Sequence, residues 1–371
     1  MNPRVPSNFS QRVRRHLKNS AHGLALGFGC AVLAAPVVFG QEIGAAPSVA
    51  EAISQEVRAI FQKCRKAVVK IEATDSHGAL SGSGFFIDPN GTILTSYTVG
   101  GESRDILVSC EGGRLPARRL VSDPRSGVAI LKVDAETPFV AIGKSRDLAI
   151  ATPVVAIGYP MDLPASPSFG TVAGFDIKYG GRYFAAMHIR ANVPVQRGQG
   201  GAPLLNLHGE VVGILISSLD AGSAAFALPI EAAEKVRKDF VRFGEVRPGW
   251  LGVGVRPAVT AVAGSTAQID QVFADAPGIK AGLEKDDIIL AIGDRKIQST
   301  DDVREASFFT TAEDELTVKV WRDGAELAVT VTPADHPTSA HMAARQMPRL
   351  QAIPTSVETV LPPLPPFDNE R

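Results

Sequence analysis

Residues 198–214 read GQGGAPLLNLHGEVVGI, a glycine-rich loop followed by short apolar runs on either side of a turn at His208-Gly209. Short apolar or alternating runs of this kind, separated by turn residues, continue outward through residues 67–228. They include residues 68–71, 85–87, 92–94, 128–133 and 154–157. Such runs are typical of β-strands, so this stretch predicts an all-β barrel or a pair of sandwiched sheets.

The composition bounds the remaining possibilities. A chain of 371 residues with 45% hydrophobic and 21% charged residues is globular, and its length suggests about two to three domains. The 35 glycines and 26 prolines, with only 6% aromatic residues, favour many turns over a helical bundle. A net charge of -1 gives no basic field for nucleic acid, and three cysteines are too few for a disulfide scaffold.

The first 40 residues have the character of an export signal. They hold five Lys or Arg and no Asp or Glu, and an apolar run over residues 23–39 follows. We interpret residues 1–40 as a signal peptide, which predicts a periplasmic or cell-envelope location. An uncleaved anchor is the alternative, and it would be the protein's one membrane contact. Cys64 and Cys110 would then remain, either paired or as separate thiols.

The rest of the chain divides by pattern. Residues 41–66 form an N-terminal helical segment with apolar residues at helical spacing, and residues 67–244 form the β-domain, ending in a helix over residues 229–243. A second unit over residues 248–333 contains two final strands joined by Asp323-Gly324. Residues 334–371 lose the strand pattern, contain LPPLPP at 361–366 and are expected to be a disordered tail.

These segments resemble the HtrA/DegP-like family, exported trypsin-fold serine proteases that carry a PDZ domain. The resemblance covers residues 67–332. Four blocks and three PDZ-like segments carry it, at residues 82–87, 92–95, 123–132 and 198–214, and then at 249–253, 281–283 and 286–289. It implies a mostly β fold, a chymotrypsin/trypsin-like double β-barrel followed by one PDZ domain.

The catalytic positions depart from this resemblance. The family's base histidine, orienting aspartate and nucleophilic serine align with Thr98, Gly127 and Gly200. A threonine hydroxyl is no useful base at neutral pH, and glycine has no side chain. We therefore expect a pseudoprotease that is not an enzyme and that needs no cofactor or metal. His188 precedes the glycine-rich loop, as a cleft-wall residue or as a relocated base.

The sequence still predicts two binding sites, one in each domain. The resemblance makes the backbone N–H groups of Gly198 and Gly200 an oxyanion-hole-like pair, with Arg197 beside its mouth. The PDZ-like unit would bind peptides by strand addition at a carboxylate loop and along a helix. Its candidate residues are Trp250, Leu251, Gly252 and Val253 in the loop, with Val303, Ala306 and Ser307 on the helix, for which Thr300 is the predicted N-cap. For Leu251 and Val253 the alternative is that they fill the core.

Three functions remain open at this point. The first is a scaffold, adaptor or regulator that binds C-terminal or extended peptides of exported proteins, with an active HtrA-like relative as a further partner. The second is a serine endopeptidase that uses residues outside the aligned positions. The third is a holdase-type chaperone for unfolded exported proteins. The resemblance also implies trimers formed through the N-terminal segment, although its helix could equally fold back on its own barrel.

Overall fold

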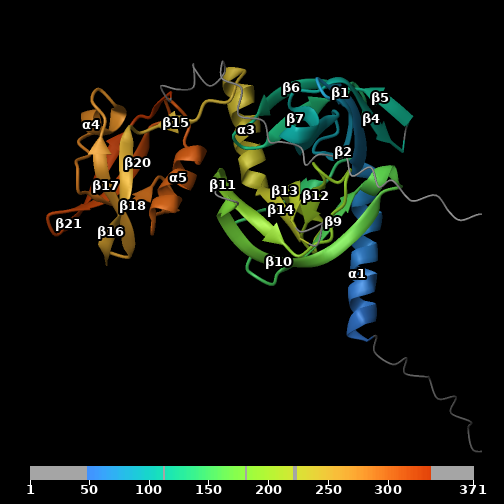
Figure 1. Cartoon of the computed structure of the whole chain (residues 1–371), viewed down its shortest axis with the longest axis horizontal. Helices are drawn as coiled ribbons and strands as arrows, with labels where there is room; N and C mark the ends of the chain where they lie inside the picture. Colours follow the sequence, from blue (N-terminus) through green and yellow to red (C-terminus); the bar gives the residue numbers. More distant parts are fainter. Residues whose placement is uncertain (1–47, 112, 180–181, 220–223, 336–371) are drawn as a thin grey trace, which may run out of the picture. The chain divides into compact units, whose positions relative to one another are not determined.

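The computed structural model describes residues 48–335, apart from residues 112, 180–181 and 220–223. The predicted signal peptide and all but the first two residues of the predicted tail lie outside these residues. Two β-sheets form the first domain and one further β-sheet organises the second. The predicted mostly β fold is confirmed (Figure 1).

The first sheet has seven strands in the order β5-β4-β1-β2-β3-β7-β6. Its strands are β1 (Val68–Asp75), β2 (Gly78–Phe86), β3 (Thr92–Ser96), β4 (Arg104–Cys110), β5 (Gly113–Pro116), β6 (Arg118–Asp123) and β7 (Val128–Lys132), with the short helix α2 (Tyr97–Gly100) directly after β3. Neighbouring strands run antiparallel, and Phe85 and Phe86 are fully buried on opposite faces of β2. Both faces of this sheet are therefore covered.

The second sheet closes on itself. Its order is β12-β9-β10-β11-β14-β13-β8, and β12 also pairs with β13, which completes a ring of six strands. The strands are β8 (Ala141–Ile142), β9 (Pro153–Gly158), β10 (Ser166–Tyr179), β11 (Arg182–Ala191), β12 (Pro203–Leu205), β13 (Glu210–Leu219) and β14 (Ala224–Pro229), with a 3₁₀ turn, η2 (Pro160–Asp162). Closure leaves the ring without free edges. The glycine-rich loop enters directly into β12.

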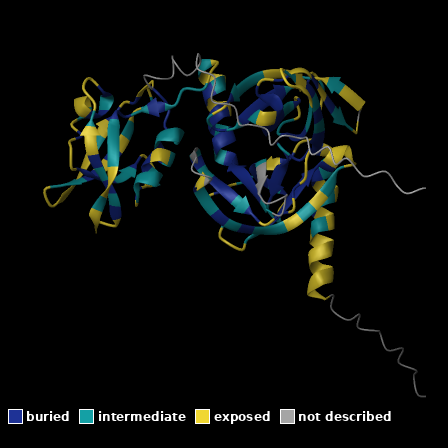
Figure 2. Ribbon diagram, in the orientation of Figure 1, coloured by how far each residue is buried: buried dark blue, intermediate teal, exposed yellow. Residues whose placement is uncertain are grey.

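Two helices flank these sheets. α1 (Val49–Cys64) begins with a capping box between Ser48 and Glu51, and a 3₁₀ turn, η1 (Arg65–Ala67), follows it. Its last turns pack on the barrel through Ile60 and Cys64, whereas its first turns are exposed (Figure 2). α3 (Ile230–Phe243) confirms the predicted second helix and ends at Gly244, which has a φ of 78°.

Cys64 and Cys110, the two cysteines among the described residues, do not form a disulfide. Cys64 is a buried free thiol at the end of α1, and its sulfur lies 3.5 Å from the carbonyl oxygen of Gly209. Cys110 is a half-buried free thiol at the end of β4. Burial raises the pKa of the Cys64 thiol, which keeps it protonated at neutral pH. Of the two sequence-based alternatives, the structure has the separate thiols.

The second domain is built on the sheet β16-β17-β18-β20-β21, with β19 at the side of β18. Its elements are β15 (Gly249–Trp250), β16 (Val253–Val262), β17 (Ser265–Val272), α4 (Pro277–Ala281), β18 (Ile288–Ile292), β19 (Arg295–Lys296), α5 (Thr300–Phe309), β20 (Leu316–Arg322), β21 (Ala325–Val331) and β22 (Ala334–Asp335). β16 pairs within this sheet with β17 alone, so its other edge is open to a further strand.

The sequence predicted two local features of this domain, a hairpin turn and the N-cap of α5. The hairpin at Asp323-Gly324 is confirmed, since both residues have positive φ angles, 50° and 87°. The N-cap prediction is wrong. Ser299, not Thr300, caps α5, because the Ser299 hydroxyl accepts the N–H of Asp302 and the Asp302 carboxylate accepts the N–H of Ser299. Thr300 is the first helical residue.

Candidate functional site

Ser83 on β2 holds the glycine-rich loop of the trypsin-like domain. Its hydroxyl donates to the carbonyl oxygen of Gly198 at 2.8 Å, and its N–H donates to the carbonyl oxygen of Gly200, also at 2.8 Å. Ser83 is fully buried. The loop 198–200 is therefore anchored to the first sheet at two points. The sequence signal was present, since Ser83 lies inside the motif GSGFFI, but sequence reasoning assigned it no role.

The structure brings the three aligned catalytic positions together. Thr98 lies on α2, and its hydroxyl is 2.9 Å from that of Ser96. The N–H of Tyr97 donates to the carbonyl oxygen of Gly127 at 2.6 Å. A Cβ atom at Gly200 would lie 3.8 Å from the Ser96 hydroxyl oxygen. The segment 96–98 thus contacts Gly127 directly and lies beside Gly200.

The chemistry of these positions is limited to hydroxyl and backbone groups. The nearest atom to a Cβ at Gly127 would be a methyl carbon of Ile216, at 3.9 Å, so an apolar group faces the orienting position. Ser96 is fully buried and Thr98 is exposed. Sequence analysis gave Ser96 no place at this centre, and its position two residues before Thr98 was the available signal.

His188 lies on β11 and is 3% exposed. Its Nδ1 is 2.8 Å from the carbonyl oxygen of Ala186. Burial lowers the pKa of His188 to about 4, so its ring is neutral at pH 7. A buried ring engaged within its own strand fits the structural reading of His188 better than a relocated base. Within the described residues, no three His, Cys, Asp or Glu side chains gather as metal ligands do.

The PDZ loop between β15 and β16 has the geometry of an anion-binding turn. Gly252 has a φ of 74°, and a Cβ there would lie 2.1 Å from the Cβ of Ala276, so only glycine fits. The carbonyl oxygens of Leu251 and Gly252 accept the N–H groups of Gly278 at 2.7 Å and Phe273 at 2.9 Å. Across the described part of the chain, the N–H groups of Leu251 and Gly252 donate to no protein group.

The predicted groove side chains fall into two sets. Leu251, Val303 and Ala306 are 4%, 6% and 1% exposed and belong to the core cluster of the domain, with Val253 packed against it. Ser307 and Trp250 are half-buried. The Ser307 hydroxyl lies 3.5 Å from the carbonyl oxygen of Gly249. Burial in the core does not test peptide contact, so the groove residues stay predictions.

Phe273, which sequence analysis missed, forms an aromatic pair with Trp250 beside the PDZ loop. The rings of Trp250 and Phe273 lie 5.9 Å apart, and Phe273 is 41% exposed. The N–H of Phe273 donates to Gly252, which ties the end of β17 to the loop. The available sequence signal for Phe273 was an aromatic residue four positions before the Pro277-Gly278 turn.

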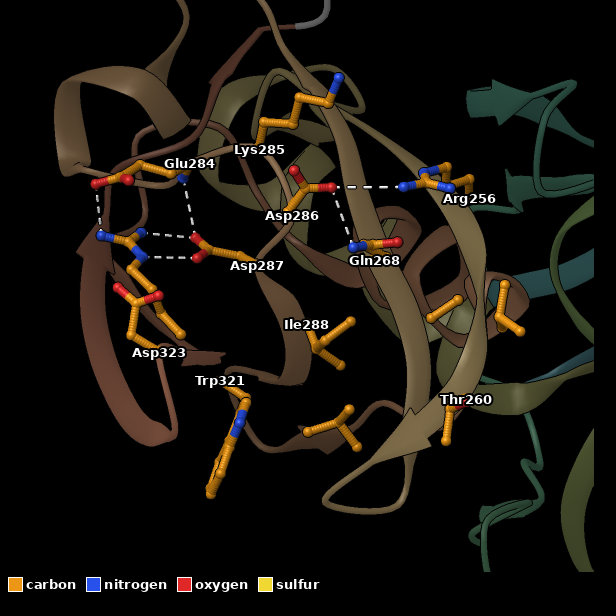
Figure 3. A pocket seen from close by; sticks show the side chains of 14 residues that line it. Arg256, Thr260, Gln268, Glu284, Lys285, Asp286, Asp287, Ile288, Trp321 and Asp323 are labelled. Atoms are coloured by element: carbon orange, nitrogen blue, oxygen red, sulfur yellow. Dashed lines mark hydrogen bonds and ion pairs between the residues drawn. The ribbon is translucent and has the colours of Figure 1, made fainter.

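A separate cavity of about 470 Å³ lies on the PDZ domain between β16, β18 and β20 (Figure 3). Ion pairs form part of its lining, beside apolar residues such as Val259, Ile288 and Trp321. The guanidinium of Arg322 donates to both carboxylate oxygens of the buried Asp287, at 2.6 and 2.7 Å. The guanidinium of Arg256 lies 3.4 Å from the carboxylate of Asp286. These charges satisfy one another, so we interpret this cavity as a by-product of the ion pairs that brace the sheet.

Comparison with known proteins agrees with this geometry. Residues 82–214 match the trypsin-like peptidase domain family, and residues 249–332 match the PDZ domain family. A periplasmic serine endoprotease DegP-like from Halomonas elongata is 33% identical over 271 residues, which cover 70% of this chain and 57% of that protein. Its counterpart from Pseudomonas fluorescens is 34% identical over 264 residues, covering 68% and 55%.

Solved structures show the same fold. The HtrA-type protease AlgW with tripeptide has a TM-score of 0.63 at 22% identity, covering 76% of this chain and 97% of that one. The serine endoprotease from Yersinia pestis has a TM-score of 0.56 at 24% identity, covering 79% and 100%. The chain spans about half the length of the curated relatives that it matches, 57% and 55% for the two above.

A trypsin-like β-barrel domain followed by a PDZ domain defines the class of trypsin-fold proteins with a C-terminal PDZ module. The chain belongs to the HtrA/DegP family. The predicted periplasmic location is confirmed by these relatives, which are named as periplasmic proteins. No helix in the described residues is long and apolar enough to cross a membrane.

The prediction that the chain is not an enzyme is contradicted by these relatives, because they are named as serine endoproteases. The replacement of the aligned residues by Thr98, Gly127 and Gly200 is a fact of the sequence. The loss of activity was an inference from that fact. Substitution at aligned positions does not by itself exclude activity, because residues outside those positions could supply the chemistry.

Proposed function

We propose that this HtrA-family protein binds polypeptides in the periplasm by their free C-termini, through its PDZ domain, and acts as a scaffold, adaptor or regulator. The observation that carries the proposal is the pair of N–H groups at Leu251 and Gly252, which have no protein acceptor among the described residues. Buried N–H groups are normally paired, and a terminal carboxylate supplies acceptors for both.

The open edge of β16 supports the same proposal. An extended peptide that adds to this edge makes backbone hydrogen bonds along its length, so affinity does not depend on one sequence. Trp250 and Phe273 add an aromatic surface beside the loop. We expect a preference for peptides whose last residues are apolar, because such residues bury aromatic surface that is otherwise hydrated.

The adaptor role requires a second binding partner besides the bound peptide. An active HtrA-like relative, or further copies of this chain in a trimer, would be brought close to a client held by the PDZ domain. The exposed first turns of α1, with Val49 at 78% and Ile53 at 42% exposure, supply apolar surface for such assembly. Size-exclusion chromatography with light scattering, on the native chain and on Ile53→Asp, tests it.

Phe273→Ala tests the peptide site without touching the buried core. We expect about fivefold weaker binding of a peptide that ends in valine and leucine with a free carboxylate, measured by calorimetry. Phe139→Ala is the matched control, because Phe139 is 55% exposed and lies in the trypsin-like domain. Equal affinities for the two variants would remove Phe273 from the site.

Serine endopeptidase activity is the second candidate, and the names of the relatives favour it. Among the described residues, the one hydroxyl oxygen within 4 Å of a Cβ built at Gly200 is that of Ser96. The test is cleavage of an unfolded protein by the native chain, Ser96→Ala and the control Ser76→Ala. Activity that a serine-reactive phosphonate blocks and that Ser96→Ala alone abolishes would support this candidate, whereas activity that survives in Ser96→Ala would exclude Ser96 as the nucleophile.

A further inference from the structure

We propose that the aromatic pair Trp250 and Phe273 of the PDZ domain is a docking site for a proline-rich segment of the same chain, residues 361–367, which read LPPLPPF. The pair lies beside the loop between β15 and β16, since a Cβ atom at Gly252 would be 3.4 Å from the ring of Trp250. A segment docked on the pair would therefore compete with a peptide held at that loop. The docking stands apart from the function proposed above, whereas the competition rests on it.

The two rings offer an angled apolar surface. Their centroids are 5.9 Å apart and their planes are tilted by 43°. Phe273 is 41% exposed and Trp250 is half-buried, so both residues keep surface that a ligand can cover. Ile279, at 48% exposure, follows on the same stretch of chain, which the bond from the N–H of Gly278 to Leu251 holds against the loop. Exposed apolar surface gathered in this way marks a binding site.

Proline-rich segments are the ligands that suit such a surface. Aromatic rings dock them in several recognition domains, because proline rings pack on aromatic faces and their fixed φ leaves little conformational entropy to lose. Residues 361–367 hold four prolines, two leucines and one phenylalanine, with no polar side chain. They contain two overlapping Pro-x-x-Pro repeats, at 362–365 and 363–366. The composition of this segment therefore matches the aromatic pair.

The point where the described residues end favours the chain's own segment over a free proline-rich partner. β22 pairs antiparallel with β15, which puts Ala334 opposite Trp250. Residues 336–360 separate this point from the segment, and a stretch of 25 residues reaches at most about 85 Å. The segment is therefore tethered near the pair, at an effective concentration on the order of 1 mM. A free partner would have to match that concentration.

A modest affinity is enough for a tethered segment. A dissociation constant of about 0.25 mM, against an effective concentration of about 1 mM, keeps about four molecules docked for each one that is free. A peptide that needs the pair free would then bind about fivefold more weakly. The segment continues into residue 368, so it brings no carboxylate, and its docking depends on the rings.

Two variants of the full chain test the docking. The docking variant carries Pro363→Ser, Leu364→Ser, Pro366→Ser and Phe367→Ser. The matched control carries Met347→Ser, Pro348→Ser, Leu350→Ser and Pro354→Ser. All eight positions lie outside residues 48–335, so the sequences of both domains stay unchanged.

The indole N–H resonances of Trp250 and Trp321, the two tryptophans of the chain, are the readout. We expect the Trp250 resonance to move in the docking variant and to stay in place in the control. The Trp321 resonance, on β20, should stay in place in both. A Trp250 resonance that is unmoved in the docking variant, or moved equally in both variants, would overturn the docking.

A peptide blocked at both ends tests the site itself. Acetyl-LPPLPPF-amide, added to the docking variant, should return the Trp250 resonance toward its native position with a dissociation constant of about 0.25 mM. Phe273→Ala should weaken this binding about fivefold, and the control Phe139→Ala should not. No shift with about 2 mM peptide would overturn the site. A shift with the free peptide, without any difference between the native chain and the docking variant, would overturn the same-chain source.

Calorimetry with the peptide that ends in valine and leucine tests the competition. We expect the docking variant to bind it about fivefold more tightly than the native chain or the control does. Equal affinities beside a moved Trp250 resonance would overturn the competition and leave the docking. Equal affinities with an unmoved resonance would overturn the docking and leave the PDZ function. If none of the three chains binds this peptide, the PDZ function fails, and the Trp250 resonance alone decides the docking.

Discussion

The N–H of Tyr97 donates a 2.6 Å hydrogen bond to the carbonyl oxygen of Gly127. This bond joins the segment of the aligned base position to the aligned orienting position. With Ser83 anchoring the loop 198–200, it keeps the backbone of the catalytic centre assembled although the side chains differ. Backbone and side chains at this centre can therefore be tested separately.

The backbone should accept a serine at position 200. Gly200 does not have a positive φ, and its Cβ would lie at ordinary van der Waals distance from Val99 and Ser96. We expect Gly200→Ser to change the free energy of unfolding by less than about 0.5 kcal/mol, measured in urea. The matched variant is Gly201→Ser, where φ is 84° and a Cβ would lie 2.1 Å from the carbonyl oxygen of Ser83. We expect it to cost at least about 2 kcal/mol, and equal costs would contradict this description of the loop.

Restoring the three side chains should raise the rate of peptide-bond cleavage. Because the positions are still assembled, the combined variant Thr98→His, Gly127→Asp and Gly200→Ser should cleave an unfolded protein at least about tenfold faster than the native chain. The control is the same variant without the serine. Gly127 has a φ of 79°, so among the three substitutions Gly127→Asp introduces the most backbone strain. A folded triple variant with no gain in rate would show that the geometry is not that of a working centre.

Stability should fall as the pH is lowered from about 6.5 toward 4, because of His188. Burial lowers the pKa of His188 to about 4 in the folded protein, whereas the unfolded chain binds the proton near 6.5. Between these values the unfolded state holds more protons, so the native state loses up to about 3 kcal/mol. His188→Gln should remove this part of the pH dependence of urea unfolding, and the exposed control His208→Gln should not. Identical slopes in the two variants would refute the assignment.

The Arg322–Asp287 pair should stabilise the PDZ domain. Asp287 is 2% exposed and receives both arms of the guanidinium, and these bonds raise the pKa of Arg322. Asp287→Ala leaves a partly buried cation without its partner, which we expect to cost about 3 kcal/mol in the thermal or urea unfolding of the chain. Glu326→Ala, which removes one end of the exposed Lys319–Glu326 ion pair on the same sheet, should cost less than about 0.5 kcal/mol. A loss of similar size in both would contradict a specific role for Asp287.

The sequence predicted the fold well because its signals are local. Short apolar runs bounded by turns such as Asp323-Gly324 define strands whatever their partners are, and Gly244 marks the end of α3. The N-cap of α5 was misplaced by one residue because Ser299 and Thr300 are both good caps, and only the bond to Asp302 decides between them.

The site was less predictable because it depends on contacts between distant segments. Ser83 lies 115 positions from Gly198, so no local pattern shows that this pair meets. Gly252 has the turn conformation that the sequence predicted, because a positive φ is a local requirement, whereas its contact with a peptide stays a prediction. Enzyme activity could not be decided from aligned positions alone, and the relatives corrected that prediction.

Recognition of a free C-terminus by the PDZ domain is the central claim, and one titration of the native chain tests it most directly. A peptide that ends in valine and leucine is titrated as the free acid and as the amide, with the amide resonances of Leu251 and Gly252 as the readout. We predict that the acid binds at least tenfold more tightly, because the two unpartnered N–H groups make stronger, charge-assisted hydrogen bonds to a carboxylate than to a neutral amide oxygen. Equal affinities, or binding that leaves both resonances unmoved, would contradict the claim.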